Sequence, residues 1–142
     1  MSSTLQNMKI LIIDDNPALV IVFANLLRIK GFSVTTEATL KAGLQNLENE
    51  SYHAVFVDAP LENYNGKQIL TILQENQVFQ KTNIFLFSGV DVFELDKWKK
   101  HGLYSYLKKP VKRGIILKAL DDVRVKILST DSQITSKPVI AE

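Results

Sequence analysis

Several features that define large classes of proteins are missing from this chain. It contains no cysteine, which excludes disulfide bonds, thiol catalysis and cysteine ligands to a metal. Its two histidines, His53 and His101, are too few and too far apart in the expected topology to suggest a zinc site. No apolar run approaches the roughly 18 residues needed to cross a bilayer, and no charged leader precedes an apolar stretch. We therefore expect a cytoplasmic protein that does not contact a membrane.

The composition is that of an ordinary globular domain, with 142 residues and 46% apolar content. The net charge of +2 hides an asymmetry, because residues 97–126 contain ten Lys or Arg and two Asp or Glu. Such a basic segment favours an acidic partner surface, although helix lysines that merely face water explain it as well. Basic composition alone does not indicate nucleic-acid binding, and we expect none.

Apolar runs alternate with segments of helical period along the chain. Alternation of this kind predicts an α/β fold, a doubly wound five-stranded parallel sheet with five helices. The predicted strands are residues 9–14, 32–36, 53–58, 83–88 and 104–107. Helices are expected from Asn16 and Pro17 onward, around 40–47, after Asn65 and Gly66, around 92–101, and up to Ile127. We expect one domain over residues 8–128, flexible residues 1–7, and a disordered tail over 129–142.

The first predicted helix has an N-terminal signal and an apolar stripe. Asn before Pro is typical of an N-cap followed by the first helical position. The spacing predicts that the helix ends before Gly31 and buries a stripe of five residues. These are Leu19, Phe23, Leu26, Leu27 and Lys30.

Polar side chains stand where four of the apolar runs end. Asp14 and Asp15 close the first run, Asp58 closes the third, Ser88 ends the fourth and Lys109 follows the fifth. In a parallel sheet, ligands sit outside the carboxyl ends of the strands, so these five side chains could meet in one crevice. Such a crevice would bind a divalent metal ion and a phosphoryl group.

The chemistry of this set is that of phosphoryl transfer. Adjacent carboxylates suit a hard cation such as Mg²⁺, and a bound cation relieves their repulsion while leaving an Asp58 oxygen free as a nucleophile. Lys109 would balance the remaining charge, and Ser88 could donate a hydrogen bond to a phosphoryl oxygen. Taken singly, each residue is more often a turn, a cap or a surface group. Their joint occurrence at strand ends favours the functional interpretation.

At these positions the chain resembles the receiver domains of two-component response regulators, of the single-domain type, over roughly residues 8–128. The acidic pair, the phosphoacceptor Asp58, the hydroxyl residue and the lysine match the family pattern, as do Gly66, Tyr106 and Pro110. The resemblance implies a flavodoxin-like receiver fold, a Mg²⁺ (or Mn²⁺) requirement, and a sensor histidine kinase or histidine phosphotransfer protein as donor. It also implies a cis peptide bond between Lys109 and Pro110.

The loop after Asp58 departs from the family pattern. The proline commonly found four residues after the phosphoacceptor is Glu62 here, and Pro60 holds the position whose backbone carbonyl usually reaches the metal ion. Neither Pro60 nor Val90 has a side chain that could orient an attacking water. We therefore expect self-dephosphorylation to take on the order of minutes or longer, because general base assistance is worth about 10²- to 10⁴-fold.

The resemblance also implies how phosphorylation reaches a partner. Ser88 moves toward the phosphoryl group, and Tyr106 turns into the vacated space, which changes the nearby surface. We interpret Trp98, Tyr104, Tyr106 and Lys108 as a partner-binding or dimer face for an unknown downstream protein target. The alternative is that Trp98 and Tyr104 are packing residues and the lysines only solubilise the protein. If this face is a dimer surface, the partner expected is a second copy of the chain, in a phosphorylation-dependent homodimer.

Two other function classes compete with a stand-alone phosphorylatable switch. One is a receiver-like binding module that works without phosphorylation, and the intact set of site residues argues against it. The other is a Mg²⁺-dependent phosphatase with an aspartyl nucleophile. Such an enzyme commonly needs an acid/base aspartate two residues after the nucleophile, where this chain has Pro60, so we expect a signalling domain rather than an enzyme.

Overall fold

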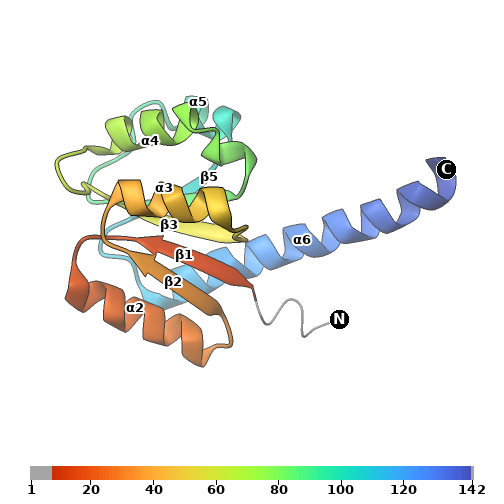
Figure 1. Ribbon diagram of the computed structural model, residues 1–142, viewed down its shortest axis with the longest axis horizontal. Coiled ribbons are helices and arrows are strands. Elements are labelled where there is room, and N and C mark those ends of the chain that lie inside the picture. Colours follow the sequence, from red (N-terminus) through yellow and green to blue (C-terminus); the bar gives the residue numbers. More distant parts are fainter. Residues whose placement is uncertain (1–7, 142) are drawn as a thin grey trace. The chain divides into compact units, whose positions relative to one another are not determined.

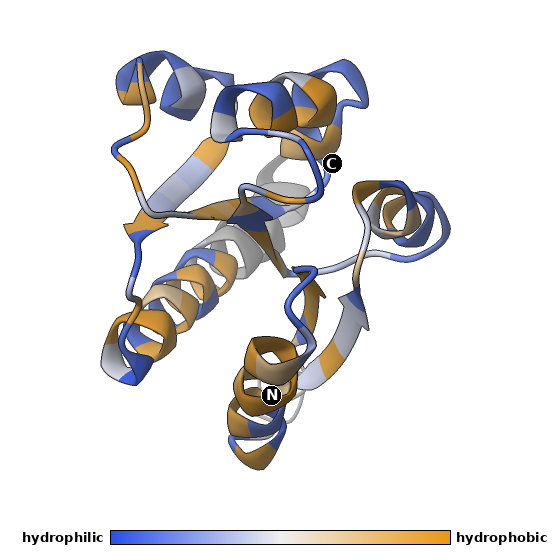
Figure 2. Ribbon diagram, turned by 90° about the vertical axis from the view of Figure 1, so that its left-hand side faces the viewer, coloured by the Kyte–Doolittle hydropathy of each residue, from blue (hydrophilic) through white to orange (hydrophobic). Residues whose placement is uncertain are grey.

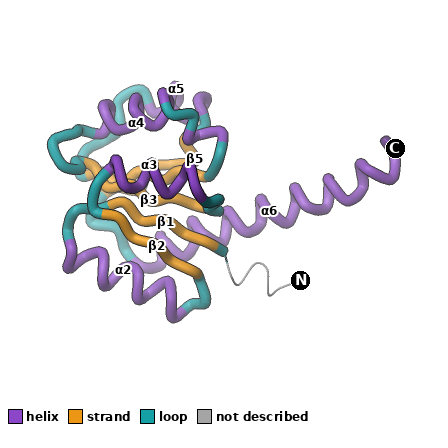
Figure 3. The backbone as a smooth tube through the Cα atoms, viewed as in Figure 1, coloured by secondary structure: helices purple, strands orange, loops and turns teal. Residues whose placement is uncertain are grey.

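The computed structural model describes the backbone of residues 8–141 and the side chains as far as residue 129; residues 1–7, predicted to be flexible, and Glu142 lie outside the described part. Its strands form one parallel sheet in the order β2-β1-β3-β4-β5 (Figures 1 and 3). This confirms the predicted five-stranded sheet. The strands are β1 (Lys9–Ile13), β2 (Ser33–Glu37), β3 (Ala54–Ala59), β4 (Asn83–Ser88) and β5 (Leu103–Lys108).

Helices follow the strands, as the alternating pattern predicts. They are α2 (Pro17–Ile29), α3 (Leu40–Asn49), α4 (Gly66–Glu75), α5 (Leu95–His101) and α6 (Arg113–Ala141), with a short 3₁₀ turn η1 (Val78–Gln80). In Figure 1, α2 covers one face of the sheet, and α3, α4 and α5 cover the other. No helix in the described part of the chain combines the length and apolar character needed to cross a membrane.

Side-chain caps fix where the helices begin, and therefore where the loops at the carboxyl edge end. The Asn16 side chain accepts a hydrogen bond from the amide of Leu19, and Pro17 is the first residue of α2. At α4, the side chains of Asn65 and Gln68 each accept a hydrogen bond from the other's amide, which forms a capping box. Both predicted helix starts are confirmed.

The sheet buries different side chains on its two faces. One face joins apolar side chains of the strands, such as Leu11 and Val57, to α3, α4 and α5 in a continuous cluster that includes Leu70 and Trp98. The other face carries an aromatic group in which ring centroids are 5.0–5.5 Å apart. Its members are Phe23, Phe56, Phe85 and Phe87. These two layers hold the strands in the register that positions the site.

The predicted buried stripe of α2 is only partly right. Ala24 and Leu27 are buried, whereas Leu19 is 60% exposed and Lys30 is also exposed. The ribbon of α2 is largely orange in Figure 2 because apolar residues occur on nearly all sides of this helix. Spacing alone therefore could not select the buried face.

The chain divides into two compact units, residues 1–111 and 112–142. The final helix was predicted from the apolar spacing of Ile116, Leu120, Val123 and Ile127; in α6 the first three are buried and Ile127 is half-buried. The backbone of α6 continues to Ala141, and the disordered tail over residues 129–142 stays a prediction. Weak apolar periodicity removes a reason to bury this segment, but residues 115–137 contain no glycine or proline that would end a helix. The domain limit at residue 128 stays a prediction.

Gly102 ends α5 and directs the chain into β5, which carries Lys109 into the site. Its φ is +118°, and an added Cβ would lie 2.7 Å from Cβ of Phe79. We expect Gly102→Ala to lower the free energy of unfolding by about 1–3 kcal/mol, the usual strain of such a backbone. Urea denaturation measures this. Gly114→Ala is the control, because a Cβ there meets nothing within 4 Å; equal losses in both variants would contradict the prediction.

Candidate functional site

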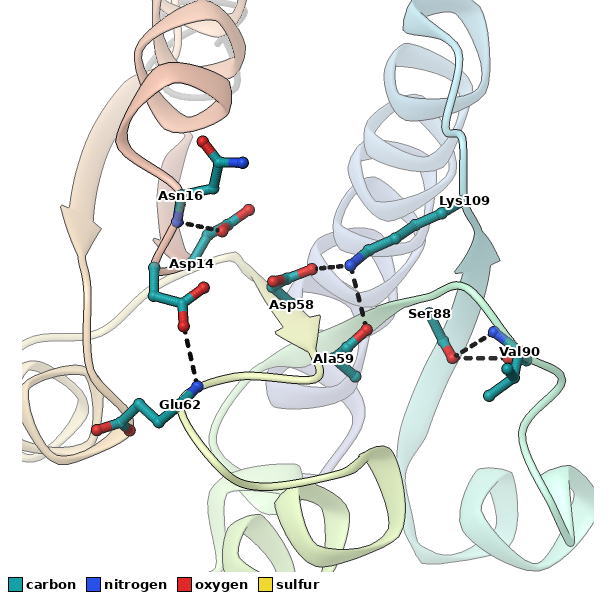
Figure 4. A network of polar contacts seen from close by, with 9 residues as sticks. Asp14, Asn16, Asp58, Ala59, Glu62, Ser88, Val90 and Lys109 are labelled. Carbon is teal, nitrogen blue, oxygen red and sulfur yellow. Dashed lines mark hydrogen bonds and ion pairs between the residues drawn. The ribbon is translucent and has the colours of Figure 1, made fainter.

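The carboxyl edge of the sheet gathers most of the predicted site residues (Figure 4). Asp14 directly follows β1, Asp58 lies near the end of β3, and Ser88 ends β4. Lys109 follows β5, which pairs with β4 so that Ser88 lies opposite Lys108. Parallel strands thus deliver residues far apart in the sequence to one edge.

Three carboxylates crowd together at this edge. One oxygen each from Asp14, Asp15 and Asp58 lies within 4.8 Å of the others. Asp14 and Asp58 are buried, whereas Asp15 is exposed. Burial, then the charges of Asp58 and Asp15, raise the pKa of Asp14, and they outweigh the hydrogen bond from the Asn16 amide and the charge of Lys109. Clustered hard oxygen ligands of this kind fit Mg²⁺, which would relieve the repulsion.

Lys109 supplies the positive charge within this group. Its Nζ forms an ion pair with Oδ1 of Asp58 and donates a hydrogen bond to the carbonyl of Ala59 at 3.1 Å. Its backbone amide donates to the carbonyl of Ser88 at 2.8 Å. The peptide bond from Lys109 to Pro110 is cis, as predicted. The lysine is thus fixed at both ends, by the sheet and by the phosphoacceptor candidate.

Backbone amides hold the other two carboxylates. Oδ1 of Asp14 accepts from the amide of Asn16 at 2.9 Å, and Oδ2 of Asp15 accepts from the amide of Glu62 at 3.0 Å (Figure 4). Glu62 has a left-handed backbone, with φ of 55°. In the sequence, Glu62 was noted only as a departure from the family pattern. Its contact with Asp15 was not predicted, because the two residues are 47 positions apart and no local pattern indicates it.

The loop after β3 differs from the expected path in another respect. The peptide bond from Ala59 to Pro60 is cis, and Pro60 is exposed. Leu61 and Tyr64 form an isolated bridge that closes a tight turn beyond it. The predicted role of the Pro60 carbonyl as a metal ligand stays a prediction.

Ser88 lies at the site, but its hydroxyl is engaged elsewhere. The hydroxyl donates to the carbonyl of Val90 at 2.6 Å and accepts from the Val90 amide at 3.2 Å. Ser88 also borders a cavity of about 200 Å³, which Gly66, Leu70 and Trp98 help to line. To reach a group on Asp58, the hydroxyl must release the loop after β4.

The same loop holds Tyr106. Oδ1 of Asp91 accepts a hydrogen bond from the Tyr106 hydroxyl and another from Nζ of Lys108, both at 3.0 Å. The Lys108 bond, then the Tyr106 bond, lowers the pKa of Asp91, and the bond to Asp91 raises the pKa of both donors. Asp91 was not among the predicted site residues, because a lone aspartate in a loop carries no signal.

The predicted partner face does not form one surface. Trp98 is 4% exposed and belongs to the core cluster, with its ring 6.4 Å from that of Phe79. Tyr104 packs against Phe85 on the aromatic side of the sheet, at 4.8 Å between centroids. Tyr106 instead packs beside the core cluster, because a register shift interrupts the pairing of β4 with β5. For Trp98 and Tyr104 the structure corresponds to the packing alternative.

The chain matches the family model of the response regulator receiver domain over residues 10–121. It is 27% identical over 113 residues to the transcriptional regulatory protein GlrR of Escherichia coli strain K12, covering 80% of this chain and 25% of that protein. It is 25% identical over 114 residues to protein PilG of Pseudomonas aeruginosa PAO1, covering 80% and 84%. The chain therefore belongs to the response regulator receiver domain family of two-component signalling.

Solved structures share this fold. The receiver domain of sensor histidine kinase PA1611 from Pseudomonas aeruginosa PAO1 has a magnesium ion coordinated in its active site cleft. It superposes with a TM-score of 0.69 at 23% identity, over 83% of this chain and 98% of that one. This chain spans only about a quarter of the length of GlrR.

The crowding of carboxylates predicts how the protein responds to metal removal. Ionised Asp14 destabilises the metal-free fold above its raised pKa, and this penalty disappears as the pH falls through that pKa. Thermal unfolding at neutral pH with EDTA or with Mg²⁺ tests this. We expect Mg²⁺ at a hundredfold excess over its Kd to stabilise the protein by about 2.7 kcal/mol.

The variant Asp14→Asn separates the destabilisation caused by the Asp14 charge from the stabilisation caused by Mg²⁺. It should raise the melting temperature in EDTA, because one repelling charge is removed, and should lose most of the Mg²⁺ effect. Asp96→Asn, in the first turn of α5, is the control and should keep the full Mg²⁺ response. A normal Mg²⁺ response in Asp14→Asn would contradict the predicted metal site.

Proposed function

We propose that this chain is a stand-alone receiver whose Asp58 accepts a phosphoryl group from the phosphohistidine of a sensor histidine kinase or a histidine phosphotransfer protein. The single observation that carries this proposal is the environment of Asp58. Its buried carboxylate lies at the end of a central strand, paired with Lys109 and flanked by Asp14 and Asp15. Family membership agrees with this chemistry.

The transfer exchanges one bond for another at phosphorus. An oxygen of the Asp58 carboxylate attacks the phosphorus atom, the bond from phosphorus to the donor imidazole nitrogen breaks, and that nitrogen keeps the electron pair. The product on this chain is an acyl phosphate. Lys109, released from its ion pair as the carboxylate charge is used, is near enough to stabilise the oxygens of the transferred group.

The residues present fit a divalent cation. Asp14, Asp15 and Asp58, with the Pro60 carbonyl, would hold Mg²⁺ or Mn²⁺, and the magnesium ion described for PA1611 supports this choice. When bound, the cation neutralises charge on the phosphoryl oxygens. Removing the charge of any one aspartate should therefore weaken both the cation site and the transfer.

The signal leaves the site through the loop after β4. When the Ser88 hydroxyl turns from the Val90 carbonyl to a phosphoryl oxygen, the loop loses two hydrogen bonds. Asp91, one residue further, then no longer holds Tyr106 and Lys108 as firmly. The exposed surface around these three residues changes, and we propose it as the face that meets a downstream protein or a second copy.

The stand-alone form is part of this proposal; the chain covers 84% of the length of PilG and 25% of that of GlrR. The predicted cytoplasmic location and the slow self-dephosphorylation belong to the same proposal. The downstream target must recognise the surface around Asp91, Tyr106 and Lys108.

Phosphorylation of Asp58 is tested by intact-mass measurement after incubation with acetyl phosphate and Mg²⁺. We expect the natural protein to gain one phosphoryl group and Asp58→Ala to gain none, because only Asp58 combines the buried nucleophile with Lys109. Asp91→Ala leaves Asp58, Lys109 and the other two aspartates in place and should still gain the group. If the natural protein gains nothing with acetyl phosphate or a phosphohistidine donor, the phosphorylation-independent binding module becomes the better description.

The role of Asp91 is tested by titrating beryllofluoride, a phosphoryl mimic, in the presence of Mg²⁺. If Asp91 holds Tyr106 in the unphosphorylated arrangement, Asp91→Ala should bind the mimic more tightly, because linkage acts in both directions. We expect a gain of no more than about fivefold, since the contact is exposed. Asp96→Ala is the control. Calorimetry that gives Asp91→Ala an unchanged or weaker affinity for the mimic would contradict this role of Asp91.

A further inference from the structure

Glu62 connects the carboxylate cluster to a helix on the core-cluster face of the sheet. Its amide donates a hydrogen bond to Oδ2 of Asp15 at 3.0 Å, and its own Oε2 accepts one from the amide of Leu40 at 3.0 Å. The two partners are 47 and 22 positions away in the sequence. One residue therefore bridges the loop after β1, the loop after β3 and the start of α3.

Each of these bonds has a distinct physical role. Asp15 is exposed, so its carboxylate would rotate freely without a donor that fixes one oxygen. The Glu62 amide is that donor, and it fixes one oxygen of a carboxylate that belongs to the cluster with Asp14 and Asp58. Fixing one ligand oxygen lowers the conformational entropy lost when a cation binds.

The other bond fixes Glu62 itself. Leu40 is the first residue of α3, so its amide has no partner within the helix, and its side chain is buried. A carboxylate at this end of a helix is also favoured by the helix dipole. The bond ties a loop residue with left-handed φ to an element that is packed into the core.

We propose that Glu62 is a positioning residue for the metal site, and that its side chain, by binding the start of α3, holds the amide that orients Asp15. This inference rests on the proposed function, because it assumes that a divalent cation binds the cluster. It goes further by assigning a role to a residue that does not touch the cation.

A simpler effect must be separated from this one. The negative charge of Glu62 attracts a cation whatever its hydrogen bonds are. Glu62→Gln removes the charge but keeps an oxygen that can accept from the Leu40 amide, whereas Glu62→Ala removes both. The difference in cation affinity between these two variants therefore measures the effect of the hydrogen bond from the Leu40 amide to the Glu62 side chain, which we call the clamp.

The experiment measures the Kd of Mg²⁺ by calorimetry and that of Mn²⁺ by electron paramagnetic resonance, on the full chain. We expect Glu62→Ala to weaken cation binding about tenfold, the low end of the loss in metal affinity seen when a residue that hydrogen-bonds a metal ligand is replaced. Glu62→Gln should retain most of the affinity. Glu94→Ala is the matched control, because Glu94 is exposed with φ of 58° and its side chain pairs only with Lys97 among the side-chain contacts described. Its Kd should equal that of the natural protein.

Two results would overturn the proposed role of Glu62: an unchanged or tighter Kd in Glu62→Ala, whether or not its melting temperature falls, or an equal loss of affinity in Glu62→Gln. Glu62→Gly provides a second variant if Glu62→Ala does not fold, because glycine accepts left-handed φ without strain, and it should lose affinity as alanine does. If the natural protein binds neither cation, the metal site of the proposed function fails together with the clamp. If it binds both and the variants are equal, only the clamp fails.

Discussion

Mutual repulsion among three carboxylates is the constraint on which this structure depends. Asp14, Asp15 and Asp58 come together because the parallel register of β1 and β3 brings their ends to one edge, and apolar layers on both faces enforce that register. The fold therefore pays a local electrostatic penalty: burial first, and then the charges of Asp58 and Asp15, raise the pKa of Asp14. Only Lys109 offsets this charge among the side chains described at the cluster. Because the clustered carboxylates repel one another, binding of a cation at this site is favourable, and this is the physical basis of its chemistry.

The same edge contains the route by which a charge change spreads. Lys109 contacts Asp58 through its side chain and the Ser88 carbonyl through its amide. Ser88 holds Val90, and the next residue, Asp91, holds Tyr106 and Lys108. Each step is a direct hydrogen bond or a neighbouring residue, so a rearrangement at Asp58 does not need to deform the sheet. Contiguous contacts of this kind can couple two arrangements of the site and the loop.

The elements that sequence reasoning predicted well share a local cause. Buried parallel strands are continuous apolar runs, and Asn16 or Asn65 marks a helix start whatever surrounds it, so strand positions, helix starts and the convergence of Asp14, Asp58 and Lys109 were predictable. The buried face of α2 was predicted only in part, because apolar residues occur on nearly all sides of this helix. Leu27 is buried and Phe23 and Leu26 are half-buried, whereas Leu19 is exposed.

What failed depends on contacts between distant residues or on a register shift. The separation of Tyr104 from Tyr106 arises from an irregularity between β4 and β5 that no residue type announces. The bonds of Glu62 and Asp91 join loop residues to partners far along the chain.

Two loops leave the site in different directions, and this separation matters for how the protein can vary. The loop after β3 connects the carboxylates to α3 through Glu62, whereas the loop after β4 connects them to β5 through Asp91. The two sets of hydrogen bonds share no residue. Because effects at sites without shared partners are usually additive, cation affinity and the surface response can change independently. Substitutions in the first loop, where this chain departs from the common family pattern, can therefore alter the cation site without altering the path to Tyr106.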